Sequence, residues 1–303
     1  MLKHVAVTLT HGLSSVAVVV VILTTSSCMV RRETRIHPPQ APAPLQEAAL
    51  ADLVARINSQ SEAVHTLVAT VDLEPTAGSI YSGVIKEYHD VKGFILLEKP
   101  DLIRIQGQAP VIRTEIFDMV SDGKEFRLYI PPKQKFIVGK TEFHRPAKNS
   151  LENLRPQHIL EALLVPPIDA ATEKYFSEEA EEAGRRFYVV SVVSPGGNGE
   201  LVLKRKVWFD RSNLELVRTQ FYTAQGKYIE DVRYSNYQDF AGVRYAAHIE
   251  LTRPVEDYAL GVTVLKATFN QPIASDKFLL EKPAGAQLVD LSAAWRQESP
   301  RGQ

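Results

Sequence analysis

"FDRSNLELVRTQFYTAQGKYIEDVRYSNYQDFAGVRYAAHIEL" (residues 209–251) sets the pattern of most of the chain. Short runs rich in Val, Ile, Tyr, Phe and Thr follow one another, separated by the polar turns "DRSN", "AQGK" and "FAG". Runs of this composition between turns that contain Gly, Asn or Asp are typical of neighbouring strands joined by hairpins. The stretch therefore predicts an antiparallel meander.

The same pattern continues on both sides of this stretch. We expect no parallel sheet, because the chain lacks helices at the spacing that parallel crossovers require. The predicted strands cover residues 66–74, 80–88, 93–99, 102–108, 113–121, 125–131, 135–140, 185–193, 200–210, 214–222, 228–237, 243–252 and 261–269.

Two segments show helical spacing instead. "LQEAALADLVARINSQSEAVHTL" (residues 45–67) places apolar residues three and four positions apart, with charged residues on the opposite side. "RPQHILEALLV" (residues 155–165) has the same spacing and is bounded by Pro156 at its start and by Pro166 and Pro167 at its end. We expect one amphipathic helix in each segment.

Several predicted strands are apolar on both faces. "GFILLE" (residues 93–98) and "FYVVSVV" (residues 187–193) do not alternate apolar and polar residues, as a sheet with one exposed face would. Either helices cover the second face, or that face lines an apolar cavity. The pattern alone supports both interpretations.

The N-terminal residues have the order of a secretory signal peptide. Lys3 supplies a positive charge, Val5 to Leu23 are mainly apolar, and Thr24 to Ser27 are small and polar. The densest apolar part, Val16 to Leu23, is shorter than the ~20 residues that a ~30 Å hydrocarbon core requires. We therefore predict that residues 1–27 are an export signal.

The end of this leader resembles a bacterial lipobox, in which small residues precede an invariant cysteine. Ser26, Ser27 and Cys28 fit the motif, whereas Thr25 stands where Leu is usual. The resemblance implies that the Cys28 thiol is acylated and that the acyl chains, at ~0.8 kcal/mol per buried CH₂, hold the protein on a membrane. The alternatives are a plain secreted protein, an uncleaved N-terminal anchor, or a cysteine buried in the fold.

A proline-rich segment separates Cys28 from the first predicted helix. "VRRETRIHPPQAPAPL" (residues 30–45) has no hydrophobic period, and its prolines favour an extended backbone. Residues 28–45 thus suit a tether between a lipidated cysteine and a folded domain. A disordered terminus without a role would have the same composition.

Composition excludes several classes of protein. The 303 residues carry a formal net charge of −1, so there is no basic excess that would favour nucleic acid. The single cysteine rules out an internal disulfide, a redox pair and a zinc site built from cysteines. The eight histidines show no metal-binding spacing, and no P-loop or GxSxG motif is present. We therefore expect no nucleic acid, metal, cofactor or catalytic activity.

Three local features have structural explanations. His158 and Glu161 share a helix face, which we interpret as a surface pair. The acidic run at residues 173–186 is typical of a solvated loop or short helix. In "LKRKVWF" (residues 203–209), Lys204 and Lys206 lie opposite Leu203 and Val207, either as an outward strand face or as a contact for anionic lipid head groups.

From residue 48 to 291 the chain resembles the LolA/LolB-type superfamily of periplasmic lipoprotein carriers and receptors. One departure is the Ala246–Ala247 pair, where family members often have proline. The stretches that carry the resemblance are "EKPDLIRIQGQAP" (residues 98–110), "VSDGKEFRLYIPPKQKFIVG" (residues 120–139), residues 209–251 and "FLLEKPAGAQLVDL" (residues 278–291).

The resemblance implies an α+β, β-dominated fold: a single antiparallel curved sheet, an unclosed half-barrel, wrapped around helices. Residues 46–291 would form this domain, and residues 292–303 a frayed tail. It also implies a hydrophobic cleft that accepts acyl chains of lipids or lipoproteins. Candidate lining residues are Leu67, Ala69, Val71, Ile95, Leu97, Ile116, Val120, Phe126, Leu128, Val189, Leu201, Leu203 and Val207.

Two functions follow from the resemblance together with the predicted anchor. One is a lipid-anchored envelope protein that binds or transfers acyl chains. The other is an anchored sensor or assembly module that contacts an envelope protein through the same fold. Met29 is not the aspartate that retains some lipoproteins in the inner membrane, which favours the periplasmic face of the outer membrane. No sequence motif supports a hydrolase.

Cys28→Ser tests the lipobox. Removing the thiol should abolish labelling by radioactive palmitate and release the protein from the membrane fraction, because the acyl chains would supply the membrane affinity. Labelling that persists in the variant would contradict the prediction.

Overall fold

A computed structural model of the chain describes residues 44–78, 86–87, 91–109, 113–141, 155–197 and 199–291. The predicted signal peptide, Cys28, the tether up to residue 43 and the tail at 292–303 lie outside the described residues.

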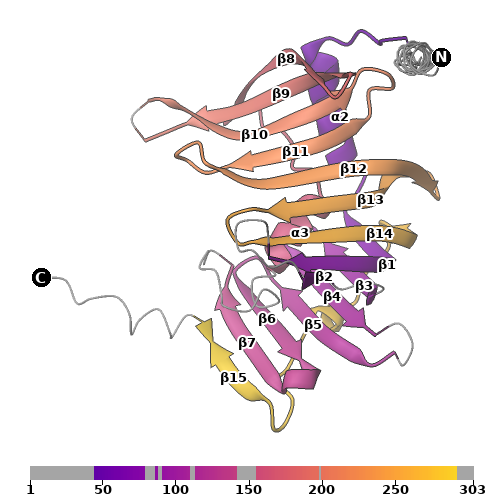
Figure 1. Ribbon diagram of the computed structural model, residues 1–303, viewed down its shortest axis with the longest axis vertical. Coiled ribbons are helices and arrows are strands. Elements are labelled where there is room, and N and C mark those ends of the chain that lie inside the picture. The colour runs from indigo at the N-terminus through magenta and orange to yellow at the C-terminus, as the bar shows by residue number, and fades with distance from the viewer. Residues whose placement is uncertain are drawn as a thin grey trace, which may run out of the picture. The chain divides into compact units, whose positions relative to one another are not determined.

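One large antiparallel sheet contains every described strand (Figure 1). Its strand order is β15-β7-β6-β5-β4-β3-β1-β14-β13-β12-β11-β10-β9-β8, with β2 paired to β1. β15 is the exception in direction, because it runs parallel to β7. The strands are β1 (Thr66–Ala77), β2 (Lys86–Glu87), β3 (Val91–Glu98), β4 (Leu102–Gln108), β5 (Glu115–Ser121), β6 (Glu125–Ile130), β7 (Lys135–Lys140), β8 (Lys174–Glu182), β9 (Arg185–Pro195), β10 (Leu201–Asp210), β11 (Leu216–Tyr222), β12 (Tyr228–Phe240), β13 (Val243–Arg253), β14 (Tyr258–Phe269) and β15 (Gln287–Asp290).

Tight turns connect neighbouring strands, as the sequence pattern of residues 209–251 predicts. Between β12 and β13, Ala241 and Gly242 both have positive φ, 55° and 91°. Two such residues in succession match the twist of a two-residue hairpin. The Asp239 carboxylate accepts a hydrogen bond of 2.8 Å from the Gly242 N–H and fixes the turn.

The sheet is curved and unclosed, and two helices lie on one of its faces, which we call the inner face (Figure 1). They are α2 (Leu50–Glu62) and α3 (Pro156–Leu163), and both predicted helices are thus confirmed. Leu53 and Ile57 of α2 and Ile159 of α3 join one core cluster with the inner-facing residues of the strands. Neither α2 nor α3 is long and apolar enough to cross a bilayer.

The outer face of β5–β7 is covered by the C-terminal segment. This segment contains two short elements, the 3-10 helix η3 (Ser275–Phe278) and β15, whereas η1 (Pro131–Lys133) turns the chain between β6 and β7. Val120 and Phe136 pack there against Leu280 and Ala286 in a second cluster. Arg104 reinforces the contact by donating a hydrogen bond of 2.9 Å to the carbonyl of Lys277. β5 and β7 thus have apolar residues covered on both faces, whereas the second face of residues 93–98 is not covered in this way, since Phe94 is 40% exposed.

The acidic run at residues 173–186 is not a loop or helix, and that prediction is wrong. Lys174–Glu182 forms β8, paired with β9 along its whole length. Most of its side chains are exposed, because β8 is the last strand of the sheet. Carboxylates on an edge strand repel further strands, which explains an acidic sequence at this place.

A register shift in β10 overturns the predicted faces of residues 203–209. Leu203 pairs with Val193, but Arg205 pairs with the adjacent Val192. The extra residue places Leu203 on the outer face while Val207 stays on the inner face. Arg205 follows the bulge in regular register with Val207, so it also faces inward, where it is buried.

Candidate functional site

The structure places most of the predicted cleft residues beneath the helices. Each of these residues is at most 3% exposed, so α2, α3 and neighbouring strands already fill the space before them. Their role as ligand contacts stays a prediction. The residues concerned are Leu67, Ala69, Val71, Ile95, Leu97, Phe126, Leu128 and Val207.

The other five predicted residues are not brought together. Ile116 packs, partly buried, against the edge of the inner core, whereas Val120 belongs to the second cluster on the outer face. Val189 is buried in β9 outside both clusters. Leu201 is 62% exposed at the end of β10, and Leu203 is half-buried on the outer face.

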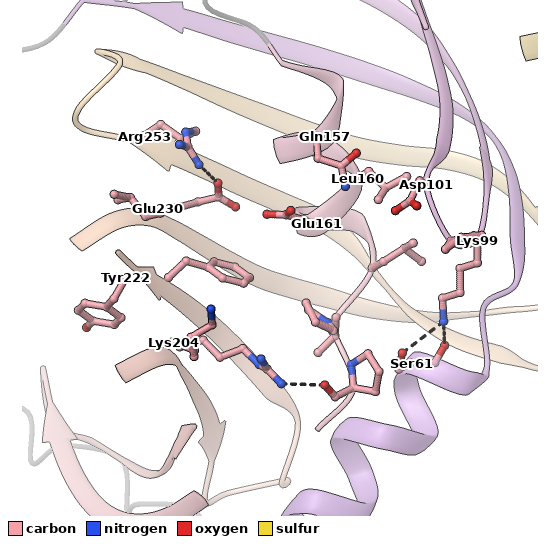
Figure 2. A pocket seen from close by; sticks show the side chains of 18 residues that line it. Ser61, Lys99, Asp101, Gln157, Leu160, Glu161, Lys204, Tyr222, Glu230 and Arg253 are labelled. Carbon is pink, nitrogen blue, oxygen red and sulfur yellow. Dashed lines mark hydrogen bonds and ion pairs between the residues drawn. The ribbon is translucent and has the colours of Figure 1, made fainter. Parts of the chain in front are cut away.

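A hollow of about 570 Å³ remains on the inner face, between α3 and the ends of β10–β13 (Figure 2). This volume lies within the range of small-molecule sites. Half of its lining is apolar or aromatic: Pro100, Leu160, Leu164, Val165, Pro166, Pro167, Phe221, Tyr222 and Ile229. The other half is polar: Ser61, Lys99, Asp101, Gln157, Glu161, Lys204, Arg205, Glu230 and Arg253.

The hollow exists because α3 ends early. Leu164 already has an extended backbone, with φ −111° and ψ 111°, and Pro166 and Pro167 follow it. A proline lacks an N–H and disfavours the helical conformation of the residue before it, so the helix cannot continue across the sheet. The extended segment instead forms one wall of the cavity.

Arg205 holds this extended segment in place. Its guanidinium donates a hydrogen bond of 2.7 Å to the carbonyl of Pro167 and two more, of 2.9 and 3.1 Å, to the carboxylate of Glu173. A buried arginine with a bidentate carboxylate partner is a strong, directional anchor. The inward-facing Arg205 of β10 therefore positions a wall of the site.

One end of the cavity is a buried cluster of carboxylates around a single guanidinium. Arg253 donates hydrogen bonds to Glu230 and, at 2.8 Å, to Glu256, and all three side chains are almost fully buried. Glu161 of α3 faces Glu230 across the hollow (Figure 2). The Oε1 atom of Glu230 is buried and accepts no hydrogen bond.

Burial governs the protonation of this cluster. It raises the pKa of Glu230 to about 8: the guanidinium of Arg253 opposes the shift, whereas the carboxylates of Glu161 and Glu256 add to it. Burial also raises the pKa of Glu161, again against the attraction of Arg253. The cluster can thus hold a proton near neutral pH and accept hydrogen bonds from a guest.

The two lysines of the lining differ in their burial and in their hydrogen-bond partners. Lys99 is turned toward the C-terminal turn of α2, where its Nζ donates to the carbonyl of Ser61 and, at 3.2 Å, to the Ser61 hydroxyl (Figure 2). Partial burial lowers the pKa of Lys99, although Glu62 counteracts the shift. Lys204 is exposed and forms no ion pair with a described residue.

Two other hollows have a different character. A groove of about 870 Å³ runs beside α2 and is lined by many charged and polar side chains, among them Asp52, Arg56 and Arg244. A third hollow, of about 380 Å³, includes Trp208, which stacks under the Arg218 guanidinium at 5.3 Å. Among the described residues, no group of three or more His, Cys, Asp or Glu is arranged to hold a metal ion.

The predicted surface pair of His158 and Glu161 is not on the surface. His158 is 5% exposed and its Nδ1 lies 3.0 Å from the Tyr258 hydroxyl, while Glu161 is half-buried at the cavity. Arg205, Glu230 and Arg253 are not among the residues predicted from the sequence. The available signal was their spacing, because each of these charged residues lies two positions from an apolar residue of the same strand that faces inward.

Comparisons with known proteins give structural likeness only. No family model matches the sequence, and no curated protein matches it significantly. A DUF1329 family protein from Desulfovibrio piger has 14% identity and a TM-score of 0.48, with 75% of this chain and 95% of that chain covered. A protein described as an outer membrane lipoprotein-sorting domain, from Vibrio parahaemolyticus, has 12% identity and a TM-score of 0.46, with 75% and 94% covered.

A LolA superfamily protein from Nitrosomonas europaea is also similar, with 11% identity, a TM-score of 0.45, and 75% of this chain and 97% of that chain covered. The superfamily recognised in the sequence is thus among the similar structures. Identities this low give no information about ligand or partner, so the function has to come from this chain's own residues.

Glu230→Gln should change how stability depends on pH. The pKa of Glu230 is about 8 in the folded state, against an ordinary value of 4.5. Between these two pH values the folded protein keeps a proton on Glu230 that the unfolded chain has lost. The free energy of unfolding of the unmodified protein should therefore fall as pH rises through this window, by on the order of 1 kcal/mol per pH unit.

Glutamine cannot ionise, so the variant should lose that part of the slope. Urea denaturation at several pH values between about 5 and about 8 measures it. Glu74→Gln, at an exposed position of β1, is the matched control and should keep the original slope. Equal slopes for Glu230→Gln and the unmodified protein would show that Glu230 is ionised in the folded state.

Proposed function

We propose that this chain is a cell-envelope protein that binds an acyl chain, carried by a lipid or lipoprotein, in the cavity beside α3. The observation that carries the proposal is the cavity itself: about 570 Å³ on the inner face, apolar along one wall and polar at its ends. An acyl chain with a polar head group is likewise apolar along its length and polar at its end.

The apolar wall supplies the driving force. Leu160, Leu164 and Val165 come from α3 and its extension, and Phe221 and Ile229 come from the facing strands. Burying each CH₂ of a chain against such side chains contributes ~0.8 kcal/mol. Binding and release of this kind need no covalent chemistry.

The size of the cavity limits the ligand. Because α2 and α3 already fill the inner face before most strands, the hollow is in the range of one small ligand. A lipoprotein with several acyl chains would place one chain here unless α3 moved. We therefore favour the capture of a single chain over enclosure of a whole lipid anchor.

The anchor at Cys28 completes the proposal. With acylated Cys28 and the tether, the protein would stay on the periplasmic face of the outer membrane and receive or hand over a chain there, as a receptor does. The second candidate is an anchored assembly module that contacts an envelope protein. The groove beside α2, with its charged walls, favours this second function as a docking place for a protein.

Ile229→Trp tests the proposed site. The indole would occupy part of the hollow from a half-buried position, so a fluorescent fatty acid should bind at least tenfold more weakly, a loss of about 1.4 kcal/mol. A fluorescence titration of the delipidated protein gives both dissociation constants.

Gln238→Trp is the matched control, because it adds the same ring at an exposed position of the same strand. It should leave the affinity unchanged. Saturable binding that is equally strong in both variants would move the site elsewhere. No binding by the unmodified protein, together with retention of one envelope protein, would favour the assembly module.

A further inference from the structure

The carboxylate end of the cavity contains acceptors for which the protein supplies no donor. Glu230 is 0% exposed, and its Oε1 atom, which accepts no hydrogen bond, is directed toward Glu161 (Figure 2). Gln157, one turn before Glu161 on α3, also has a buried side-chain carbonyl without a donor. A buried acceptor left without a donor costs about 1–3 kcal/mol, so a donor in the hollow would be stabilised there.

Three of the four cations of the lining are held by protein groups, and the fourth, Lys204 of β10, forms no ion pair with either of the two facing carboxylates. Arg253 is shared between Glu230 and Glu256, and Arg205 is bound to Glu173. Lys99 is turned toward Ser61, away from the two facing carboxylates (Figure 2). Glu161 consequently forms no ion pair with a described residue.

We propose that Glu161 and Glu230 bind the protonated primary amine of an amphipathic ligand whose chain lies along the apolar wall. An ammonium group carries three donors and no acceptor, so it can serve the unpaired Oε1 acceptors of Glu230 and Gln157 and replace the proton that Glu230 holds when the cavity is empty. An anionic head would be repelled by the same carboxylates, and a hydroxyl would satisfy acceptors without adding a positive charge.

This inference rests on the proposed function, since it names the head group of the molecule held in that cavity. It predicts a preference among ligands of equal chain length. Dodecylamine, dodecanol and dodecanoic acid carry a positive, a neutral and a negative head at neutral pH on the same chain. Measured below the micelle concentrations of the amine and the acid and below the solubility limit of dodecanol, they separate the contribution of the head from that of the chain.

Isothermal titration of the purified protein with the three compounds is the experiment. Dodecylamine should bind at least tenfold more tightly than dodecanol, a difference of about 1.4 kcal/mol, and dodecanoic acid most weakly. Glu161→Gln should remove most of the preference for the amine while changing the affinity for dodecanol less than about twofold. Glu230→Gln should act in the same direction, and Glu161→Gln keeps the test available if that buried variant fails to fold.

Glu74→Gln removes an exposed carboxylate that is not part of the cavity lining and should leave all three affinities unchanged. Dodecanol and dodecanoic acid binding as tightly as the amine would overturn the ammonium site and leave the acyl-binding function standing. It would mean that Glu161 and Glu230 only share a proton with each other. Binding of none of the three would overturn both proposals.

Discussion

Packing of two short helices against the inner face of the open sheet is the interaction on which the rest of the structure depends. A sheet that is apolar on this face is stable in water only if something covers it, and Leu53, Ile57 and Ile159 supply the cover. The cover is incomplete where α3 stops before Pro166 and Pro167. The cavity is thus a consequence of helix length, and its apolar wall includes Leu160, Leu164 and Val165, which also belong to the core cluster.

Regular strand alternation brings charge into this cavity. Arg205, Glu230 and Arg253 each lie two residues from an apolar inner-facing residue of the same strand, the last two near a strand end. Buried charges of this kind lower stability unless they are paired, and Arg253 pairs with Glu230 and Glu256 but not with Glu161. In the proposed site, a ligand that donates hydrogen bonds would pair with the remaining acceptors.

Periodicity predicts the architecture well and the site poorly. Strand alternation, helical spacing and the prolines around residues 155–167 predict an antiparallel sheet with two helices, because these signals are local. The lining of the cavity depends on which strand faces the helices cover and on a helix end, neither of which alternation encodes. Leu67 and Val71 were therefore expected to contact ligand but lie beneath the helices, whereas Glu230 was overlooked within a strand. The strand β8 was missed because an edge position tolerates an acidic sequence that composition assigns to a loop.

Photo-crosslinking from inside the cavity tests the central claim most directly. A benzophenone side chain at Leu164 would stand in the apolar wall, and one at Val68 would stand on an exposed apolar position of β1 away from the cavity. After irradiation with vesicles that contain a radiolabelled phospholipid, the account predicts a lipid adduct at position 164 and little or none at position 68. Equal labelling at both positions, or none at 164, would contradict the claim that the hollow beside α3 receives an acyl chain.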